Sequence, residues 1–144
     1  MILPDERATR AAGTALGRAA RAGDVVTLSG DLGAGKTTLA RGFLEALGHE
    51  GEVPSPTFAI VQPYEDLEPP VWHVDLYRLE APDELQELGL DAAEEGVLLI
   101  EWPERAGEAR WQDALRIALS TRPDGARSLT ALVPQSWKAR WPFP

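Results

Sequence analysis

The chain has 144 residues, the usual size of one domain, and 44% of them are hydrophobic, which is enough to form a buried core. It contains no cysteine, which excludes disulfides, thiolate nucleophiles and sulfur-ligated metals. The net charge of −9 gives a surface that repels a phosphate backbone, so we do not expect direct binding to nucleic acid. The longest apolar run is far too short to span a membrane, and residues 1–10 do not resemble a secretory signal, so we expect a cytoplasmic protein.

The first half of the chain predicts a helix, a strand and a second helix. Alanine and leucine recur at helical spacing over residues 6–21, after Asp5 as a candidate N-cap. Residues 24–29 are apolar and β-branched, which predicts a buried strand. A glycine-rich loop then leads into a helix predicted over residues 36–47.

The second half predicts short strands separated by turns. Prolines 54 and 56 predict a loop before the next strand, and Pro82 fits the first turn of a short helix. A turn at Pro123-Asp124-Gly125 predicts a hairpin. The predicted strands are 57–62, 71–76, 97–102, 114–120 and 128–133, and the predicted helix is 82–88. This order predicts one α/β domain over residues 1–144, a three-layer fold whose mixed sheet has antiparallel strands at one edge.

Residues 30–37 match the phosphate-binding pattern G-x-x-x-x-G-K-[ST] in full. Glycines let the backbone approach a phosphate, and the N–H groups of residues 33–37 would form an anion-binding nest at a helix N-terminus. Lys36 would bridge the β- and γ-phosphates, and the Thr37 hydroxyl would bind Mg²⁺. The predicted ATP-binding residues are Gly30, Asp31, Gly33, Ala34, Gly35, Lys36, Thr37 and Thr38. The alternative is a glycine-rich turn that caps an ordinary helix, but the preceding strand and following helix favour a P-loop, and hence a P-loop NTPase fold.

Two acids stand where predicted strands end. Four apolar residues precede Glu101, and a less apolar run precedes Asp75. Ligands of open α/β sheets bind at the carboxyl ends of strands, so we expect Glu101 to coordinate or support Mg²⁺. Asp75 would orient a water on the metal or polarise the attacking water. The alternative for each is a solvated surface acid.

Other residues each allow two interpretations. Thr57 lies where P-loop proteins have a switch loop, and its hydroxyl would sense the γ-phosphate, unless this is an ordinary proline turn. Arg78 and Arg105 either neutralise charge in the transition state or form surface ion pairs. We predict that His73 is a packed strand residue rather than a base. Trp102, next to Glu101, is predicted to be a packing residue, with a place near the nucleotide as the further option. The aromatic and basic tail with Trp137, Lys138, Arg140 and Trp141 would either bind a partner or pack on its own domain.

Several segments together resemble the TsaE family, also called YjeE, of bacterial ATPases. The resemblance runs from the first helix to about Arg105 and is not carried past that residue. It rests on five segments: GDLGAGKTT at 30–38, SPTF at 55–58, HVDLYRL at 73–79, ELGL at 87–90 and IEWPER at 100–105. The resemblance implies that Thr57 is the switch threonine and that Asp75 and Glu101 are the family's two important acids.

The resemblance also implies a cellular role. Such a protein is expected to hydrolyse ATP with Mg²⁺ and to support N6-threonylcarbamoyladenosine modification of tRNA. It would bind a complex of TsaB and TsaD subunits and reset that complex between turnovers. It would contact tRNA only through these partners, and it would have no role at a membrane.

The residues alone leave three alternatives. A small-molecule kinase would share the P-loop but needs an acceptor pocket and an arginine-bearing lid, for which no arginine-rich segment is visible. A GTPase would usually carry an Asn-Lys-x-Asp segment, which is absent. An interaction protein with negligible hydrolysis would bind nucleotide and respond to partners without turnover.

Overall fold

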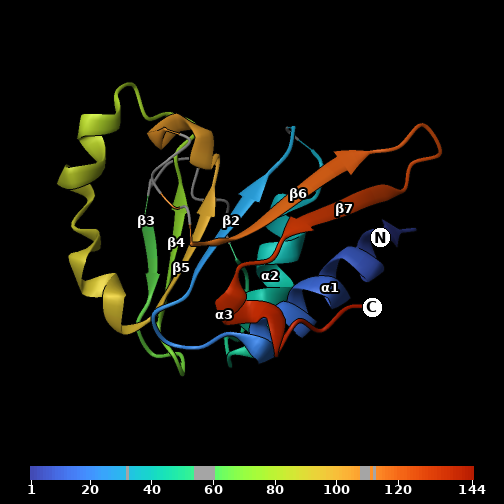
Figure 1. Cartoon of the computed structure of the whole chain (residues 1–144), viewed down its shortest axis with the longest axis horizontal. Coiled ribbons are helices and arrows are strands. Elements are labelled where there is room, and N and C mark those ends of the chain that lie inside the picture. Colours follow the sequence, from blue (N-terminus) through green and yellow to red (C-terminus); the bar gives the residue numbers. More distant parts are fainter. Residues whose placement is uncertain (32, 54–60, 108–110, 112) are drawn as a thin grey trace.

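Seven strands form one mixed sheet in the computed structural model, which describes residues 1–31, 33–53, 61–107, 111 and 113–144 (Figure 1). The strand order is β1-β7-β6-β2-β5-β4-β3. The strands are β1 (Ile2–Leu3), β2 (Val25–Ser29), β3 (Val61–Tyr64), β4 (Val71–Asp75), β5 (Val97–Glu101), β6 (Leu115–Thr121) and β7 (Arg127–Leu132). The α-helices are α1 (Glu6–Ala19), α2 (Lys36–Ala46) and α3 (Gln135–Lys138), and the 3₁₀ helices are η1 (Pro82–Leu88), η2 (Leu90–Glu95) and η3 (Pro103–Ala106).

The middle of the sheet is parallel and its edges are antiparallel. Strand β2 pairs in parallel with both β5 and β6, and β5 pairs in parallel with β4. The hairpin of β6 and β7, the β1–β7 pair and the β3–β4 pair are antiparallel. The predicted α/β class with a mixed sheet is confirmed, and antiparallel pairs occur at both edges rather than at one.

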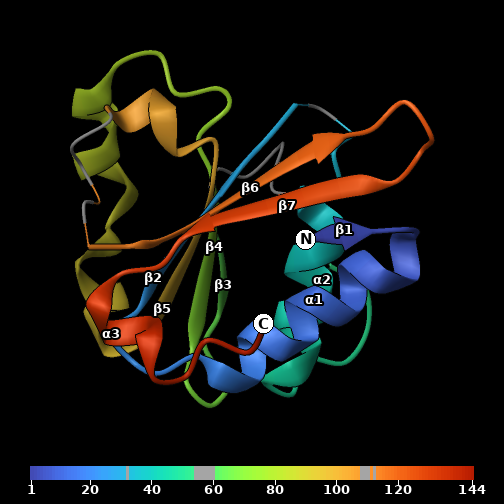
Figure 2. The ribbon, with the colours of Figure 1, turned by 45° about the vertical axis from the view of Figure 1, so that its right-hand side comes forward.

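Side chains alternate along the strands and divide the core into two layers. On β5, Leu99 belongs to the cluster that includes Leu16 of α1 and Phe43 of α2. Its neighbour Ile100 belongs to a second cluster with Leu85 of η1. Successive residues of a strand point to opposite faces, so α1 and α2 cover one face and the 3₁₀ segments cover the other. In Figure 2, α1 and α2 lie side by side below the β6–β7 hairpin.

Glycines bring α1 and α2 into backbone contact. A Cβ atom added at Gly13 would lie 2.0 Å from the carbonyl oxygen of Leu39, and one added at Gly42 would lie 2.0 Å from that of Arg10. No side chain fits at such distances. Because α2 begins at the end of the P-loop, this contact sets the position of the loop's helical end against α1.

The observed elements differ from the predicted ones mainly at their ends and in short segments. Helix α1 ends at Ala19, two residues before its predicted end. Strand β3 covers Val61–Tyr64 instead of 57–62, and residues 57–60 lie outside the described part. Pro63 fits there because β3 is the last strand of the sheet, where a missing N–H is tolerated. Sequence patterns missed β1, η2, η3 and α3, which are too short to show a period.

The C-terminal tail packs on its own domain. Trp137 is only 1% exposed and belongs to the larger core cluster. Arg140 forms two hydrogen bonds of 2.6 and 2.7 Å to Asp24, donates to the carbonyl of Ala19 at 2.8 Å and stacks on Trp137 at 4.1 Å. Of the two interpretations of the tail, the structure supports internal packing for these residues.

Within the described part of the chain, no helix is both long enough and apolar enough to cross a bilayer.

The glycine contact between α1 and α2 predicts the sign of a substitution. In an open helix, Gly to Ala stabilises by about 1 kcal/mol. At Gly13, the added methyl group meets the Leu39 backbone, so Gly13→Ala should lower the free energy of unfolding by about 1–3 kcal/mol. Denaturant unfolding would measure this, with Arg7→Ala at an exposed position of α1 as control. A stabilised Gly13→Ala protein would contradict the close contact.

Candidate functional site

The P-loop, residues 30–37, joins the end of β2 to the start of α2. Gly30, Gly33 and Gly35 have positive φ angles of 146°, 80° and 103°, which favour glycine. A Cβ at Gly30 would also lie 2.4 Å from the carbonyl oxygen of Leu119 on β6. The N–H of Ala34 donates to the Asp31 carbonyl at 3.1 Å, so this group is engaged within the loop. Conformation thus favours glycine at all three positions, and at Gly30 the lack of space excludes a side chain as well.

Parallel pairing brings the two predicted acids together. Asp75 is the partner of Glu101 in the β4–β5 ladder, and Leu28 is the partner of Glu101 in the β2–β5 ladder. Both carboxylates therefore lie at the strand ends beside the P-loop. Asp75 is 6% exposed and Glu101 is 3% exposed, which excludes the alternative of solvated surface acids.

Glu101 is held by a buried histidine. The Nε2 atom of His73 lies 2.7 Å from Glu101 Oε2, and His73 is fully buried. Since a carboxylate accepts, we assign the hydrogen to Nε2. His73 is a packed strand residue, as predicted, but its contact with Glu101 was not foreseen. His73 lies two residues before Asp75 on β4, so this strand supplies both Asp75 and the hydrogen-bond partner of Glu101.

Asp75 is held in a turn and is hard to ionise. Its Oδ1 atom accepts a hydrogen bond of 2.9 Å from the N–H of Tyr77. Burial raises the pKa of Asp75 above its usual value, and the nearby charge of Glu101 adds to this effect. A carboxylate with a raised pKa is a better proton acceptor than an exposed one.

Lys36 lies folded against its own loop. Its Nζ atom donates to the carbonyl oxygens of Gly30 and Asp31, the latter at 3.1 Å, and lies 4.0 Å from the centre of the Trp102 ring. Lys36 is 5% exposed, and burial lowers its pKa. Trp102 has a left-handed backbone with φ of 58°, which is uncommon for a bulky residue. Trp102 was predicted to be a packing residue, and the structure places its ring over the lysine.

Arg127 of β7 braces the P-loop from the hairpin. Its Nε and Nη2 atoms donate to the carbonyls of Ala34 and Gly33, both at 3.1 Å, and Nη1 donates to the carbonyl of Gly125 at 2.8 Å. Sequence reasoning missed this residue, because it lies more than 90 positions from the loop and in no recognisable motif. In the sequence, the one indication of its position is that it follows the predicted Pro123-Asp124-Gly125 turn by two residues.

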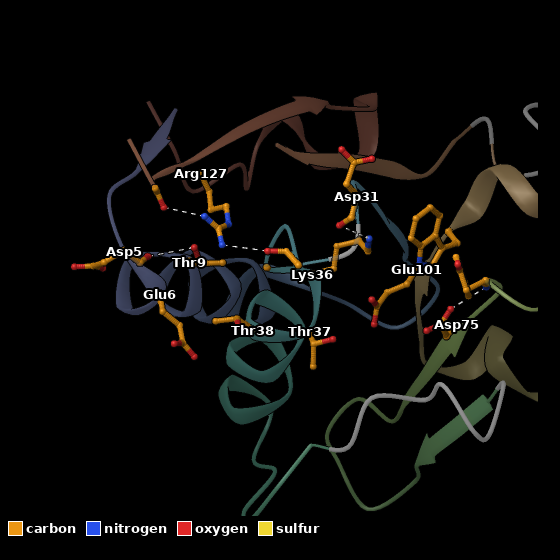
Figure 3. Close-up of a pocket in the computed structure, with 15 residues that line it drawn as sticks. Asp5, Glu6, Thr9, Asp31, Lys36, Thr37, Thr38, Asp75, Glu101 and Arg127 are labelled. Atoms are coloured by element: carbon orange, nitrogen blue, oxygen red, sulfur yellow. Dashed lines mark hydrogen bonds between the residues drawn. The ribbon is translucent and has the colours of Figure 1, made fainter. Parts of the chain in front are cut away.

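These groups surround one cavity of about 510 Å³ (Figure 3). Most of the predicted site residues line it: Asp31, Gly33, Gly35, Lys36, Thr37, Thr38, Asp75 and Glu101. Residues from α1, β7 and the segment after β4 and β5 complete the lining. Thr57 lies outside the described residues, so its predicted role stays a prediction. Arg105 packs 5.6 Å from the Tyr77 ring, and Arg78 is exposed in the turn after β4.

The donor set of this cavity suits a magnesium-bound polyphosphate. Thr37, Asp75 and Glu101 offer hydroxyl and carboxylate oxygens, the ligands that Mg²⁺ prefers. Lys36 and the first turn of α2 supply positive charge for phosphate oxygens. Lys36, Asp75 and Glu101 thus line one cavity, and within the described part of the chain no salt bridge joins Lys36 to either acid.

The raised pKa of Asp75 predicts that the site lowers the stability of the ligand-free protein. Ionising Asp75 costs more in the folded chain than in the unfolded chain. The carboxyl group therefore lowers stability as pH rises from its unfolded pKa through its higher folded pKa. Asp75→Asn retains an acceptor for the Tyr77 N–H and should be more stable than the parent at pH 7 by about 0.5–2 kcal/mol.

Urea unfolding of the ligand-free protein between pH 3.5 and 8 would test this, since the gain should disappear near and below about pH 4. Asp66→Asn, at an exposed turn, is the matched control. If Asp75→Asn were less stable than the parent at pH 7, the account of a buried, costly carboxylate would be wrong.

Comparison with known proteins gives a consistent result. A family model described as "Threonylcarbamoyl adenosine biosynthesis protein TsaE" matches residues 3–129. A Bacillus subtilis protein named tRNA threonylcarbamoyladenosine biosynthesis protein TsaE is 46% identical over 113 residues, which cover 77% of this chain and 70% of that protein. A Streptomyces coelicolor protein of the same name is 46% identical over 114 residues, covering 76% of this chain and 77% of the relative.

A solved structure agrees with these sequence matches. The crystal structure of YdiB from Bacillus subtilis superimposes with a TM-score of 0.80 at 35% sequence identity, covering 95% of this chain and 86% of that one. The resemblance first seen in short motifs therefore extends through the fold and past Arg105. The chain belongs to the TsaE family of threonylcarbamoyl adenosine biosynthesis proteins.

Proposed function

We propose that this protein is a Mg²⁺-dependent ATPase that supports N6-threonylcarbamoyladenosine modification of tRNA by acting on a complex of TsaB and TsaD subunits. The observation that carries the ATPase is one cavity that joins five P-loop residues, Lys36 and Thr37 among them, to two buried carboxylates at adjacent strand ends. A glycine turn that merely capped a helix would need neither the carboxylates nor a buried lysine.

Binding would begin with the P-loop and Lys36. Backbone N–H groups of the loop and the N-terminus of α2 favour the phosphates, and Lys36 would exchange the Gly30 and Asp31 carbonyls for phosphate oxygens. Bound phosphate would also add negative charge beside an ammonium group whose charged form burial disfavours.

The two acids would have different roles. Thr37 and Glu101 would hold Mg²⁺, which would neutralise charge on the phosphates. The His73 contact fixes the orientation of Glu101. Asp75, with its raised pKa, would accept a hydrogen bond from the attacking water and draw its proton away. Thr57 would add a hydroxyl that responds to the γ-phosphate.

The family supports the cellular role. The relatives named above are tRNA threonylcarbamoyladenosine biosynthesis proteins. The net charge of −9 disfavours direct contact with tRNA, so the partners would hold the RNA. TsaB and TsaD are therefore the proposed targets of the nucleotide-dependent cycle, and hydrolysis by the isolated chain would be slow.

Lys36 provides a direct test of the nucleotide site. Lys36→Met should lower the affinity for ADP and ATP by about ten- to 150-fold, since it removes charge-assisted hydrogen bonds to phosphate. It should not unfold the protein, because it replaces a buried ammonium by an apolar chain of similar length. Isothermal titration with ADP and a melting curve would measure both effects. Lys138→Met on the exposed face of α3 is the control, and equal affinity in the Lys36 variant and the parent would rule out the P-loop assignment.

The partners provide a separate test of the cellular role. Purified TsaB and TsaD should bind the chain more tightly with ATP and Mg²⁺ than with ADP or no nucleotide, and should raise its phosphate release at least about tenfold over the isolated chain, the gain expected when a partner completes charge stabilisation at the site. Glu101→Gln should remove the stimulated phosphate release. If neither binding nor stimulation occurs while Lys36-dependent ADP binding persists, the partner role fails and the nucleotide site survives.

A further inference from the structure

The net charge of −9 is divided unevenly over the fold. Residues 50–113 carry 17 acidic and three basic side chains, whereas the other 80 residues carry six acidic and eleven basic ones. The acidic stretch forms β3, β4, β5 and the 3₁₀ helices at one side of the sheet, and the remainder forms β1, β2, β6, β7 and the α-helices (Figure 1). The protein therefore has a strongly acidic half and a basic half, which its total charge does not reveal.

Arginines of the basic half lie on the outer face of α1. Arg7 and Arg18 are both exposed and are eleven residues apart, which places them on one face of the helix, about 16 Å apart along its axis. The buried residues of α1, such as Leu16, lie on the opposite face. Between the two arginines, the outer face carries only small side chains, including the exposed Ala11. Arg21, just beyond the end of the helix, is exposed as well.

These arginines are not neutralised by the acids around α1. Two acids near the helix, Asp24 and Glu45, are each held by another arginine through two hydrogen bonds of 2.6 and 2.7 Å. Within the described part of the chain, the side chains of Arg7, Arg18 and Arg21 take part in no hydrogen bond or salt bridge. Their guanidinium donors are therefore available to anionic groups outside the chain.

The chemistry of this face favours an acidic protein surface over nucleic acid. A chain with a net charge of −9 repels a long polyanion. Helix α1 also contains no aromatic residue on which a base could stack. A folded partner with a few carboxylates avoids both difficulties, because one guanidinium group can bind one carboxylate through two parallel hydrogen bonds.

We propose that the outer face of α1, which carries Arg7 and Arg18, is the surface by which this protein docks on an acidic patch of its protein partner. The proposal rests on the proposed function and adds which face meets the TsaB–TsaD complex. The same patch repels the acidic half of this protein, so charge also sets the orientation of docking. Asp5, Glu6 and Thr9 at the start of α1 line the nucleotide cavity, so a partner on α1 lies next to that cavity.

Charge reversal on this face tests the proposal. Arg7→Glu and Arg18→Glu should each lower the rate of association with TsaB–TsaD in ATP, Mg²⁺ and low salt by about five- to tenfold, because each places a like charge against the acidic patch. The loss should shrink at high salt, which screens exposed charges. Arg122→Glu on the β6–β7 hairpin changes the net charge equally and should leave the rate within about twofold of the parent. Surface plasmon resonance would measure the rates, and ADP titration should give the parental affinity for all three variants.

The other outcomes of this experiment are distinct. Equal rates in the parent and in both α1 variants, or an equal loss in Arg122→Glu, would overturn the docking face and leave the partner role intact. A parent that does not bind the complex at all would overturn the partner role itself. If Arg18→Glu weakened binding to free tRNA and left association with the complex unchanged, the face would belong to RNA and the proposal would be wrong.

A second measurement does not depend on a change of charge. The chain has no cysteine, so Ala11→Cys introduces a single thiol on the outer face of α1. Docking should remove most of the reactivity of this thiol toward N-ethylmaleimide, as followed by mass spectrometry of the chain. Asp83→Cys, at an exposed position of the acidic half, should react at an unchanged rate. Protection of Asp83→Cys without protection of Ala11→Cys would place the partner on the acidic half and overturn the proposal.

Discussion

The parallel register of β2, β5 and β4 is the constraint on which the site depends. Pairing of Leu28 with Glu101, and of Glu101 with Asp75, sets two carboxylates and the start of the P-loop at one edge of the sheet. Side chains alternate along a strand, so a slip of one residue in β4 would turn Asp75 to the face covered by the 3₁₀ segments. The hydrophobic residues that fill both faces of these strands are therefore what places the polar site.

Burial of charged groups at this site lowers the stability of the ligand-free protein. Lys36 has a lowered pKa and Asp75 a raised one, and both shifts come first from loss of water. Among the residues that the structure describes, the buried Nδ1 atom of His73 has no hydrogen-bond partner, which adds a further cost. A polyphosphate with its metal would place negative charge beside Lys36 and positive charge beside Asp75, both of which line the cavity. Ligand binding and folding stability are then coupled, because the same interactions serve both.

Much of the fold and half of the site could be predicted from the sequence because they depend on local patterns. A buried strand is predicted by the run of apolar residues before Glu101, and a phosphate-binding loop by the spacing of Gly30, Gly35 and Lys36. The His73–Glu101 contact could not be predicted, since it requires the register between two strands. Arg127 needed the hairpin to fold back over the P-loop, and the two-residue strand β1 exists only because β7 offers it a partner.

The left-handed backbone of Trp102 has a consequence for how this protein can change. A bulky residue in that region costs on the order of 1–3 kcal/mol, which glycine would largely relieve. Glycine would also remove the ring that lies over the Lys36 ammonium and beside Tyr77. The ring also packs against the core cluster that contains Val74, Leu76 and Ile100, so relief of backbone strain and loss of packing oppose each other at this position. The tryptophan therefore ties the stability of the fold to the surroundings of Lys36, and a substitution chosen for either property changes the other.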